Sequence, residues 1–207
     1  MSQRSNLPML LAEPPSLLHW LPSILDRIDP VQLFQAPRPL EIELGSGDGS
    51  FLVEYAHSHH ERNFIGVERL LGRIRKMARK GQRAGLTNLR GIRIESSYFL
   101  EYLLPAHSAT ALHIYFPDPW PKRKHWRHRL INERFRALAH RALAAGGRVY
   151  LRTDDREYFE RMEAVFNRCV SFHTVATPDE LARLPTDFER DFAARGAQTL
   201  RAAYEAR

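Results

Sequence analysis

Residues 40–49 read LEIELGSGDG, an alternating strand pattern that runs directly into a glycine-rich turn. Apolar and acidic residues alternate through 40–44, as they do in a half-buried strand. The glycines at 45, 47 and 49 let the backbone approach a ligand closely, and residues 50–57 continue with the apolar spacing of a helix. A strand, a glycine turn and a helix are the first unit of a Rossmann-like sheet, so we expect an α/β fold.

The spacing of the glycines helps to distinguish a dinucleotide from an adenosyl ligand. A dinucleotide fingerprint has a third small residue three positions after its second glycine, and here that position holds Ser50. Gly49 makes the pattern GxGxG instead, a spacing common for adenosyl ligands. An NAD-dependent dehydrogenase is disfavoured further because we find no catalytic acid–base pair. Gly45 and Gly47 are therefore candidate cofactor-binding residues.

Further apolar runs predict strands over 63–68, 89–94, 111–116, 148–152, 171–176 and 198–204, with helices over 69–84, 129–145 and 155–170 between them. We expect a mostly parallel seven-stranded sheet flanked by helices, with the last strand antiparallel. Four of these strands end in or beside an acid: Glu68, Glu95, Asp118 and Asp154. Ligands of open α/β sheets bind outside the carboxyl ends of the strands, so these acids are candidate site residues.

Two of the acids suit an adenosine. Glu68 lies 23 residues after Gly45, a distance typical of an acid that accepts hydrogen bonds from both ribose hydroxyls. Glu95 can meet the exocyclic amine of an adenine. The alternatives are a helix-start acid for Glu68 and an exposed strand-end acid for Glu95. A NAD ribose would use the same acid, so Glu68 does not distinguish the cofactors.

Residues 117–129 read PDPWPKRKHWRHR. Proline fixes φ and restricts the residue before it, so Asp118 and Trp120 lie on a stiff, non-helical segment. A rigid carboxylate next to cations mixed with aromatic residues indicates a reactive site beside a nucleic-acid surface. The cations of this tract are Lys122, Arg123, Lys124, Arg127 and Arg129. The alternative is a solvated turn before a basic helix start.

The composition narrows the class of protein. The 207 residues carry a net charge of +7 and a pI near 9.9, which favours a polyanionic partner such as nucleic acid. The single cysteine, Cys169, fits a reducing compartment, so we expect a cytoplasmic protein. The first residues lack the pattern of a signal peptide, and no apolar run is long enough to span a membrane. The sequence leaves monomer and homodimer open.

We expect two parts of the chain: a proline-rich arm over 1–38 that packs on the body, with short helices over 16–21 and 23–28, and one domain over 39–207. Thr177 and Glu180 predict a capping box for a short helix that ends near 184, followed by a polar loop over 185–189.

The cations at 69, 73, 76, 80 and 83 form one helical face that either tracks phosphates or is simply solvated. We expect no metal site, because the histidines at 57, 59 and 60 lack further ligands at suitable spacing.

Taken together, these segments resemble the bacterial tRNA (guanine-N7)-methyltransferases, TrmB-like proteins among the class I methyltransferases. The resemblance runs from about Leu40 to about Tyr204. It rests on the strand before the glycine turn, Gly66-Val67-Glu68, the segment from Phe116 to Lys122 with its basic tail, Thr153-Asp154, and Thr186-Asp187-Phe188-Glu189. The proline-rich acid segment and the late Thr-Asp-Phe-Glu segment are the specific features.

The resemblance implies a Rossmann-like class I methyltransferase domain that uses S-adenosylmethionine and acts on tRNA. Its cofactor positions fall on Glu41, Glu68, Glu95 and Asp118, and Asp118 is also the implied catalytic residue. Its tRNA-substrate positions fall on Lys122, Asp154, Thr186, Asp187, Phe188 and Glu189. Two positions depart from the family pattern: Glu43 stands in place of a glycine, and Glu95 in place of an aspartate.

The implied reaction is methylation of guanine N7 in the tRNA variable loop. N7 has an exposed lone pair and loses no proton, so alignment and electrostatics, rather than a general base, should provide the catalysis. We expect Asp118, Asp154 or Glu189 to accept from the two donors on the guanine edge, Trp120 or Phe188 to stack on the base, and Arg123, Lys124, Arg127 and Arg129 to hold phosphates. The alternatives are a class I methyltransferase acting on another RNA and a non-catalytic RNA-binding protein.

Overall fold

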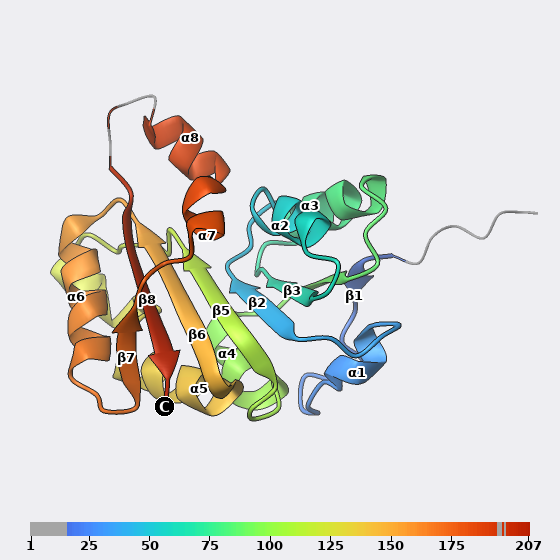
Figure 1. Cartoon of the computed structure of the whole chain (residues 1–207), viewed down its shortest axis with the longest axis horizontal. Helices are drawn as coiled ribbons and strands as arrows, with labels where there is room; N and C mark the ends of the chain where they lie inside the picture. Colours follow the sequence, from blue (N-terminus) through green and yellow to red (C-terminus); the bar gives the residue numbers. More distant parts are fainter. Residues whose placement is uncertain (1–15, 194–195, 197) are drawn as a thin grey trace, which may run out of the picture.

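The computed structural model describes residues 16–193, 196 and 198–207. An eight-stranded sheet in the order β1-β4-β3-β2-β5-β6-β8-β7 runs through the protein (Figure 1). The strands are β1 (Leu18–His19), β2 (Leu40–Leu44), β3 (Asn63–Val67), β4 (Leu89–Ile92), β5 (Ala109–Tyr115), β6 (Leu143–Thr153), β7 (Phe172–Val175) and β8 (Leu200–Ala206). Strand β8 is antiparallel to both of its neighbours, and the other pairings are parallel. The expected mostly parallel sheet with an antiparallel last strand is confirmed.

Helices cover both faces of the sheet. They are α1 (Pro30–Leu33), α2 (Leu52–Ser58), α3 (Leu71–Arg83), α4 (Ser96–Tyr98), the π-helical turn η1 (Phe99–Leu103), the 3-10 helix η2 (Arg123–His128), α5 (Glu133–Ala142), α6 (Arg156–Asn167), α7 (Asp179–Arg183) and α8 (Asp187–Ala193). Successive side chains of a strand point to opposite faces, so each covered face has its own core.

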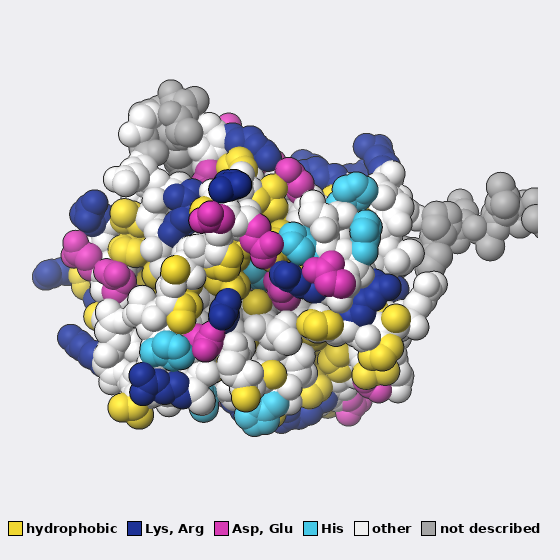
Figure 2. All heavy atoms as spheres, viewed as in Figure 1, with side chains coloured by type: hydrophobic (Ala, Val, Ile, Leu, Met, Phe, Trp, Pro, Cys, Tyr) yellow, Lys and Arg dark blue, Asp and Glu magenta, His cyan; other side chains and the backbone are white. Residues whose placement is uncertain are grey.

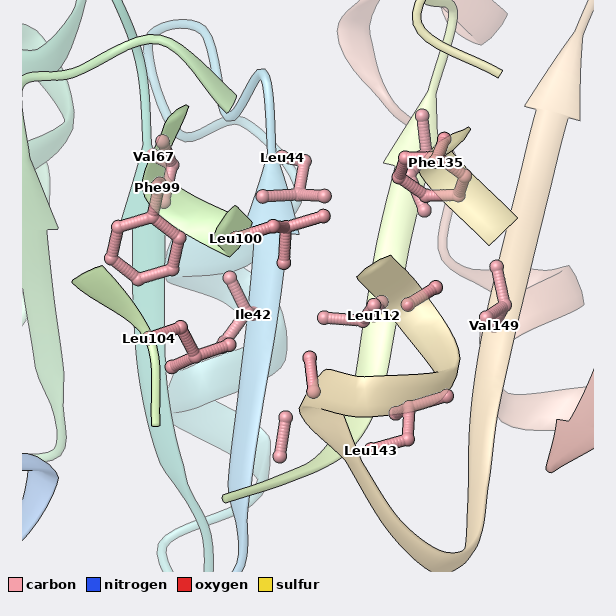
Figure 3. Close-up of a cluster of buried hydrophobic side chains, with 14 of the residues drawn as sticks. Ile42, Leu44, Val67, Phe99, Leu100, Leu104, Leu112, Phe135, Leu143 and Val149 are labelled. Carbon is pink, nitrogen blue, oxygen red and sulfur yellow. The ribbon is translucent and has the colours of Figure 1, made fainter. Parts of the chain in front are cut away.

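One core cluster lies between the sheet and η1, α5 and α6, where Ile42, Leu44, Leu112 and Val149 meet side chains such as Phe99 and Phe135 (Figure 3). The second lies between the sheet and α2, α3 and α7, and includes Phe51, Tyr55, Met77, Tyr115 and Leu181. Because Ile42 and Leu44 face the first cluster, Glu41 and Glu43 on the same strand face the second. Two acidic side chains of β2 are therefore buried under α2 and α7.

The segment before β2 adds a strand that the sequence pattern did not predict. Leu18 and His19 pair in parallel with Gly91 and Ile92 of β4, where a helix over 16–21 was expected. Leu17 and Leu18 are both buried, and the Gly91 amide donates to the Leu17 carbonyl at 2.8 Å. Residues 23–28 form no helix either, and α1 begins only after Asp29, whose side chain accepts from the Val31 amide.

The predicted helix over 129–145 is wrong at both ends. The Asn132 side chain accepts from the Phe135 amide and so starts α5 at Glu133. Strand β6 begins at Leu143, which pairs with Ala109. The capping box predicted at Thr177 is also absent: Pro178 precedes α7, which has no side-chain cap. Sheet pairing and other partners outweigh local propensity at these positions.

Strand β2 marks the point where the sheet reverses its order. It pairs with β3 on one side and with β5 on the other. The connection after β2 and the connection after β5 therefore leave two neighbouring strands and run toward opposite ends of the sheet. Such a switch point is where open α/β sheets bind ligands. Among the described residues, none of the helices is both long and apolar enough to cross a membrane.

Candidate active site

The turn after β2 is open on its outer side. Gly45 and Gly47 have φ angles of +84° and +57°, and a Cβ atom built on either would meet no atom within 4 Å. The amides of Gly45 and Ser46 both donate to the Val67 carbonyl of β3, at 2.8 and 3.0 Å. Hydrogen bonds to β3 thus fix the turn to the sheet, and the space on the other side of its glycines is free for a bound small molecule.

Glu68 supports this turn from the end of β3. Its Oε2 accepts from the Gly47 amide at 3.1 Å, and its Oε1 accepts from the Leu70 amide at 2.7 Å. Only 8% of the side chain is exposed. Glu95 lies at the end of the next strand along the sheet, where it is exposed and caps α4 by accepting from the amides of Ser97 and Tyr98 at 3.0 and 2.8 Å.

Glu41 lies at a distance from the turn. It lies four residues before Gly45, about 13 Å along the strand at ~3.3 Å per residue. Its carboxylate accepts from Arg62 Nη1 at 2.9 Å and lies 2.7 Å from His113 Nε2. Burial would raise the pKa of Glu41, but these two partners outweigh it and hold the pKa below its ordinary value. The carboxylate is thus engaged at a distance from the glycine turn.

Glu43 is the strand β2 acid nearer to the turn, two residues before Gly45, and it was not among the site residues predicted from the sequence. It is 4% exposed, and its Oε2 has no hydrogen-bond partner among the described residues. Burial raises the pKa of Glu43 to about 8, opposed by the charge of Arg152 and assisted by Glu68 and Asp48. The signal was its place two residues before the first glycine, on the same strand face as Glu41.

These features suit S-adenosylmethionine. The open turn would take the methionine part, the unpaired Glu43 oxygen would take its ammonium group, and Glu68 and Glu95 lie at the ends of the next two strands for the adenosine. Ser46 Oγ is a second buried polar atom beside the turn with no partner among the described residues. A buried polar atom without a partner costs ~1–3 kcal/mol, which a polar ligand would recover.

The turn after β5 is strained on both sides of Asp118. Phe116 and Trp120 have φ angles of +51° and +44°, in a region that side chains other than glycine rarely adopt. Asp118 itself is exposed. Strained backbone persists only where the surroundings fix it, and it is common at active sites.

Arg129 fixes this turn. Its Nε donates to the Pro119 carbonyl at 2.6 Å, and its two terminal nitrogens donate to both oxygens of Glu157 at 3.0 and 2.7 Å. The guanidinium also lies 4.7 Å from the ring centroids of Trp126 and Tyr158. Arg129 is 3% exposed and is therefore a buried, structural cation. The other cations of its tract are exposed: Lys122, Arg123, Lys124 and Arg127.

The segment expected as a loop over 185–189 is the start of α8. Glu189 Oε2 accepts from the Thr186 amide at 2.8 Å, and Thr186 Oγ1 accepts from the Glu189 amide at 3.1 Å. This is a reciprocal capping box. Thr186 and Glu189 are buried by it, whereas Asp187 and Phe188 are exposed. The four predicted substrate residues thus divide into two that build the helix end and two that face outward.

Arg152 holds this helix end against the sheet. It is 1% exposed, and its guanidinium donates to Glu189 Oε2 at 2.7 Å, to the Leu184 carbonyl at 2.9 Å and to the Leu181 carbonyl. It also lies 4.1 Å from the centroid of the Tyr115 ring. Arg201 donates to the other Glu189 oxygen at 2.6 Å. An arginine inside an apolar strand pattern was the available signal for this role, and it was missed.

Three segments meet at the switch point. The Asp187 amide donates to Ser50 Oγ at 3.3 Å, which joins the start of α8 to the glycine turn. The rings of Phe188 and Phe116 lie 5.9 Å apart, which joins α8 to the Asp118 turn. Helices α7 and α8 rise above the carboxyl ends of β5 and β6 (Figure 1). Asp154, exposed, follows β6 at the same edge of the sheet.

Comparison with known proteins agrees with this architecture. A family model described as "Putative methyltransferase" (Methyltransf_4) matches residues 37–202. Among solved structures, the 16S rRNA methyltransferase KamB aligns with a TM-score of 0.62 and 16% identity over 84% of this chain and 91% of KamB. TrmN from Thermus thermophilus aligns with a TM-score of 0.59 and 16% identity over 86% of this chain and 47% of TrmN. At this identity the likeness establishes the class I methyltransferase fold.

Sequence relatives are more similar. Proteins named tRNA (guanine-N(7)-)-methyltransferase from Sodalis glossinidius and Syntrophotalea carbinolica are 35% and 33% identical over 79% and 84% of this chain, and 70% and 77% of their own. One from Chromohalobacter salexigens is 35% identical over 74% of this chain, which spans only 62% of that relative's length. The chain therefore belongs to the tRNA (guanine-N(7)-)-methyltransferase family.

Proposed function

We propose that this protein transfers a methyl group from S-adenosylmethionine to N7 of a guanosine in the variable loop of tRNA. The observation that carries the proposal is the meeting of the glycine turn, the strained Asp118 turn and the start of α8 at one switch point. The names of the relatives at 33–35% identity supply the substrate and the position on the base. The cofactor supplies the methyl group as an electrophile on a positively charged sulfur.

Glu43 replaces Glu41 in the proposed cofactor site. Its unpaired oxygen beside the glycine turn suits the ammonium group, whereas both Glu41 oxygens are engaged with Arg62 and His113. Gly45, Gly47, Glu68 and Glu95 keep the roles that the sequence suggested. Glu68 and Glu95 accept from neutral backbone amides, whereas Glu41 is already paired with the cation of Arg62. Binding of a cation beside Glu43 would favour its charged form, so cofactor binding should release protons near neutral pH.

Asp118 is the proposed catalytic residue. Guanine N7 loses no proton on methylation, and the purine gains positive charge in the transition state. A carboxylate held on a strained turn can stabilise that charge without reorganising. Asp118 and Asp154 are also the proposed acceptors for the two N–H donors on the guanine edge, because the Glu189 oxygens already accept from Arg152, Arg201 and the Thr186 amide.

The remaining residues bind and place the tRNA. Phe188, 49% exposed beside the Asp118 turn, is the proposed stacking surface for the guanine. Lys122, Arg123, Lys124 and Arg127 contact phosphates, while Arg129 positions the turn that carries Asp118. Action on tRNA would place the protein in the cytoplasm.

The test incubates the protein with labelled S-adenosylmethionine and an unmodified tRNA transcript, then cleaves at 7-methylguanosine with borohydride and aniline. We expect one cleavage site in the variable loop, lost when that guanosine is replaced by adenosine. Methyl transfer to ribosomal RNA but not to tRNA would support the other-RNA alternative. Tight tRNA binding without cofactor binding or methyl transfer would support the non-catalytic alternative.

A further inference from the structure

Helix α3 is strongly basic. Helix α3 contains six cations in thirteen residues and no acid: Arg73, Arg75, Lys76, Arg79, Lys80 and Arg83. Removing these six from the 31 lysines and arginines leaves 25, against 24 acidic residues, so without α3 the chain would carry a net charge of +1 instead of +7.

The cations of α3 cover the whole side of the helix that faces away from the core. Ile74, Met77, Ala78 and Gly81 are its buried residues. At 100° per residue the cations fall on the opposite side, and Arg73, Arg75, Lys76, Arg79 and Arg83 are exposed. Among the residues that the structure describes, Lys80 alone of the six lies within ion-pair distance of an acid, 2.9 Å from Asp48. Figure 2 shows lysine and arginine side chains at the upper right of the molecule, where Figure 1 places α3.

This helix is packed directly against the glycine turn. A Cβ atom built on Gly49 would lie 2.2 Å from Met77 Cγ, and one built on Gly66 would lie 2.5 Å from Met77 Sδ, so no gap separates α3 from the turn. The Lys80–Asp48 pair ties the last turn of α3 to the same segment. A polyanion on the outer face of α3 would therefore be held in a fixed position relative to the cofactor edge.

We propose that the outer face of α3 is a second binding surface for the tRNA backbone, on the other side of the cofactor edge from Lys122–Arg127. The inference rests on the proposed function for the identity of the polyanion. The row Arg73, Lys76, Lys80 and Arg83 places cations about 4.5 to 6 Å apart along about 15 Å of the helix axis. Binding along it releases counterions, so the affinity gained here depends strongly on salt.

An anionic membrane surface is the competing partner for a basic helix. A helix that lies in a membrane interface needs an exposed apolar face opposite its cations. The apolar face of α3 is already buried against β3, β4 and the glycine turn, as Ile74 and Met77 show with no exposed area. The exposed face of α3 consists mainly of cations, which favours a backbone of phosphates as the partner.

The test compares two triple variants by filter binding of an unmodified tRNA transcript between 50 and 250 mM KCl. Arg73→Gln/Lys76→Gln/Arg83→Gln removes three charges from α3 and keeps good helix formers. Arg38→Gln/Arg168→Gln/Arg207→Gln removes three exposed charges at the edge of the sheet where the parallel strands begin. We expect the α3 triple to raise the Kd for tRNA about tenfold or more and to reduce the salt slope by about 2 to 3, and the control to change the slope by less than about 1.

Two further measurements distinguish a lost tRNA contact from a variant that is misfolded. Calorimetry should give the same Kd for S-adenosylmethionine in the α3 triple variant as in the wild type. If the triple variant does not fold, the single variant Lys76→Gln should reduce the salt slope of tRNA binding by about 1. Unchanged tRNA affinity and slope, an equal loss in the control triple, or a loss confined to phosphatidylserine vesicles would overturn the inference. Absence of 7-methylguanosine with the wild type would instead overturn the proposed function and leave the α3 binding result standing.

Discussion

Replacing Arg152 with methionine should destabilise the protein and release the helix end that carries the predicted substrate residues. Methionine has a similar length and is apolar, so it fills the space but donates no hydrogen bond. The substitution leaves the Glu189 carboxylate, which is 5% exposed, without its partner at 2.7 Å. It also removes the donor to the carbonyls of Leu181 and Leu184 and the cation that faces the Tyr115 ring.

The magnitude follows from burial. Removing one member of a buried ion pair costs about 3–5 kcal/mol, because the remaining charge stays desolvated. The remaining Arg201–Glu189 contact at 2.6 Å is partly exposed and compensates little of this. We therefore expect the free energy of unfolding to fall by about 3–5 kcal/mol, which moves the midpoint of urea unfolding down by about 2 M at an m-value near 2 kcal/mol/M.

The assay is urea unfolding of a double-mutant cycle. Glu189→Gln removes the charge, yet glutamine can still accept from the Thr186 amide in a capping box. The double variant Arg152→Met/Glu189→Gln should therefore recover about 1–3 kcal/mol relative to the sum of the single variants. In the single variant, trypsin should cleave faster at Arg183 and Arg190. A loss below about 1 kcal/mol, or strictly additive variants, would refute the reasoning that Arg152 anchors α8 through Glu189.

Three further predictions concern the turns around the switch point. Asp118→Asn should lower kcat at least about 100-fold in methyl-transfer assays with an unchanged melting temperature, and near-normal turnover would contradict the proposed role. Arg129→Lys loses the paired bonds to Glu157 and the contact to the Pro119 carbonyl, so kcat should fall while the salt slope of tRNA binding stays constant; a shallower slope would indicate a phosphate contact instead. Because the pKa of Glu43 is raised from 4.5 to about 8, its protonated form stabilises the fold fully below about pH 4.5, and this contribution is lost as the pH rises toward 8. Relative to Glu43→Gln, the wild-type free energy of unfolding should thus fall by about 1.4 kcal/mol per pH unit between pH 5 and 7, whereas parallel urea-titration curves would exclude the raised pKa.

The strand and glycine pattern was sufficient to predict the sheet, because period-2 alternation and apolar runs are local signals. The additional strand β1 was not predictable in the same way. Leu18 and His19 are two residues in a proline-rich stretch, and they become a strand only because β4 offers an unpaired edge. Likewise, nothing local makes Leu143 leave a helical pattern; its pairing with Ala109 does. These outcomes depend on contacts between residues far apart in the sequence.

The candidate site likewise contains residues that the sequence could predict and residues that it could not. The positions of acids at strand ends follow from the topology of a parallel sheet, so Glu68, Glu95, Asp118 and Asp154 were predictable. The choice between Glu41 and Glu43 was not, because both point to the same face of β2 and differ only in which neighbours satisfy them. Arg62 comes from the turn before β3 and His113 from β5, and together they saturate Glu41.

Buried charge on the sheet is the feature that sequence pattern describes least well. Strand β6 reads as apolar, yet its Arg152 is buried because α7 and α8 surround the guanidinium with two carbonyls and a carboxylate. Such a charge is tolerable only when every donor has a partner, so its position fixes the segment that supplies those partners. The placement of Asp187 and Phe188 beside the glycine turn therefore depends on a residue in the middle of the core. Variants of Arg152 should alter tRNA binding although Arg152 is not itself among the proposed tRNA-binding residues.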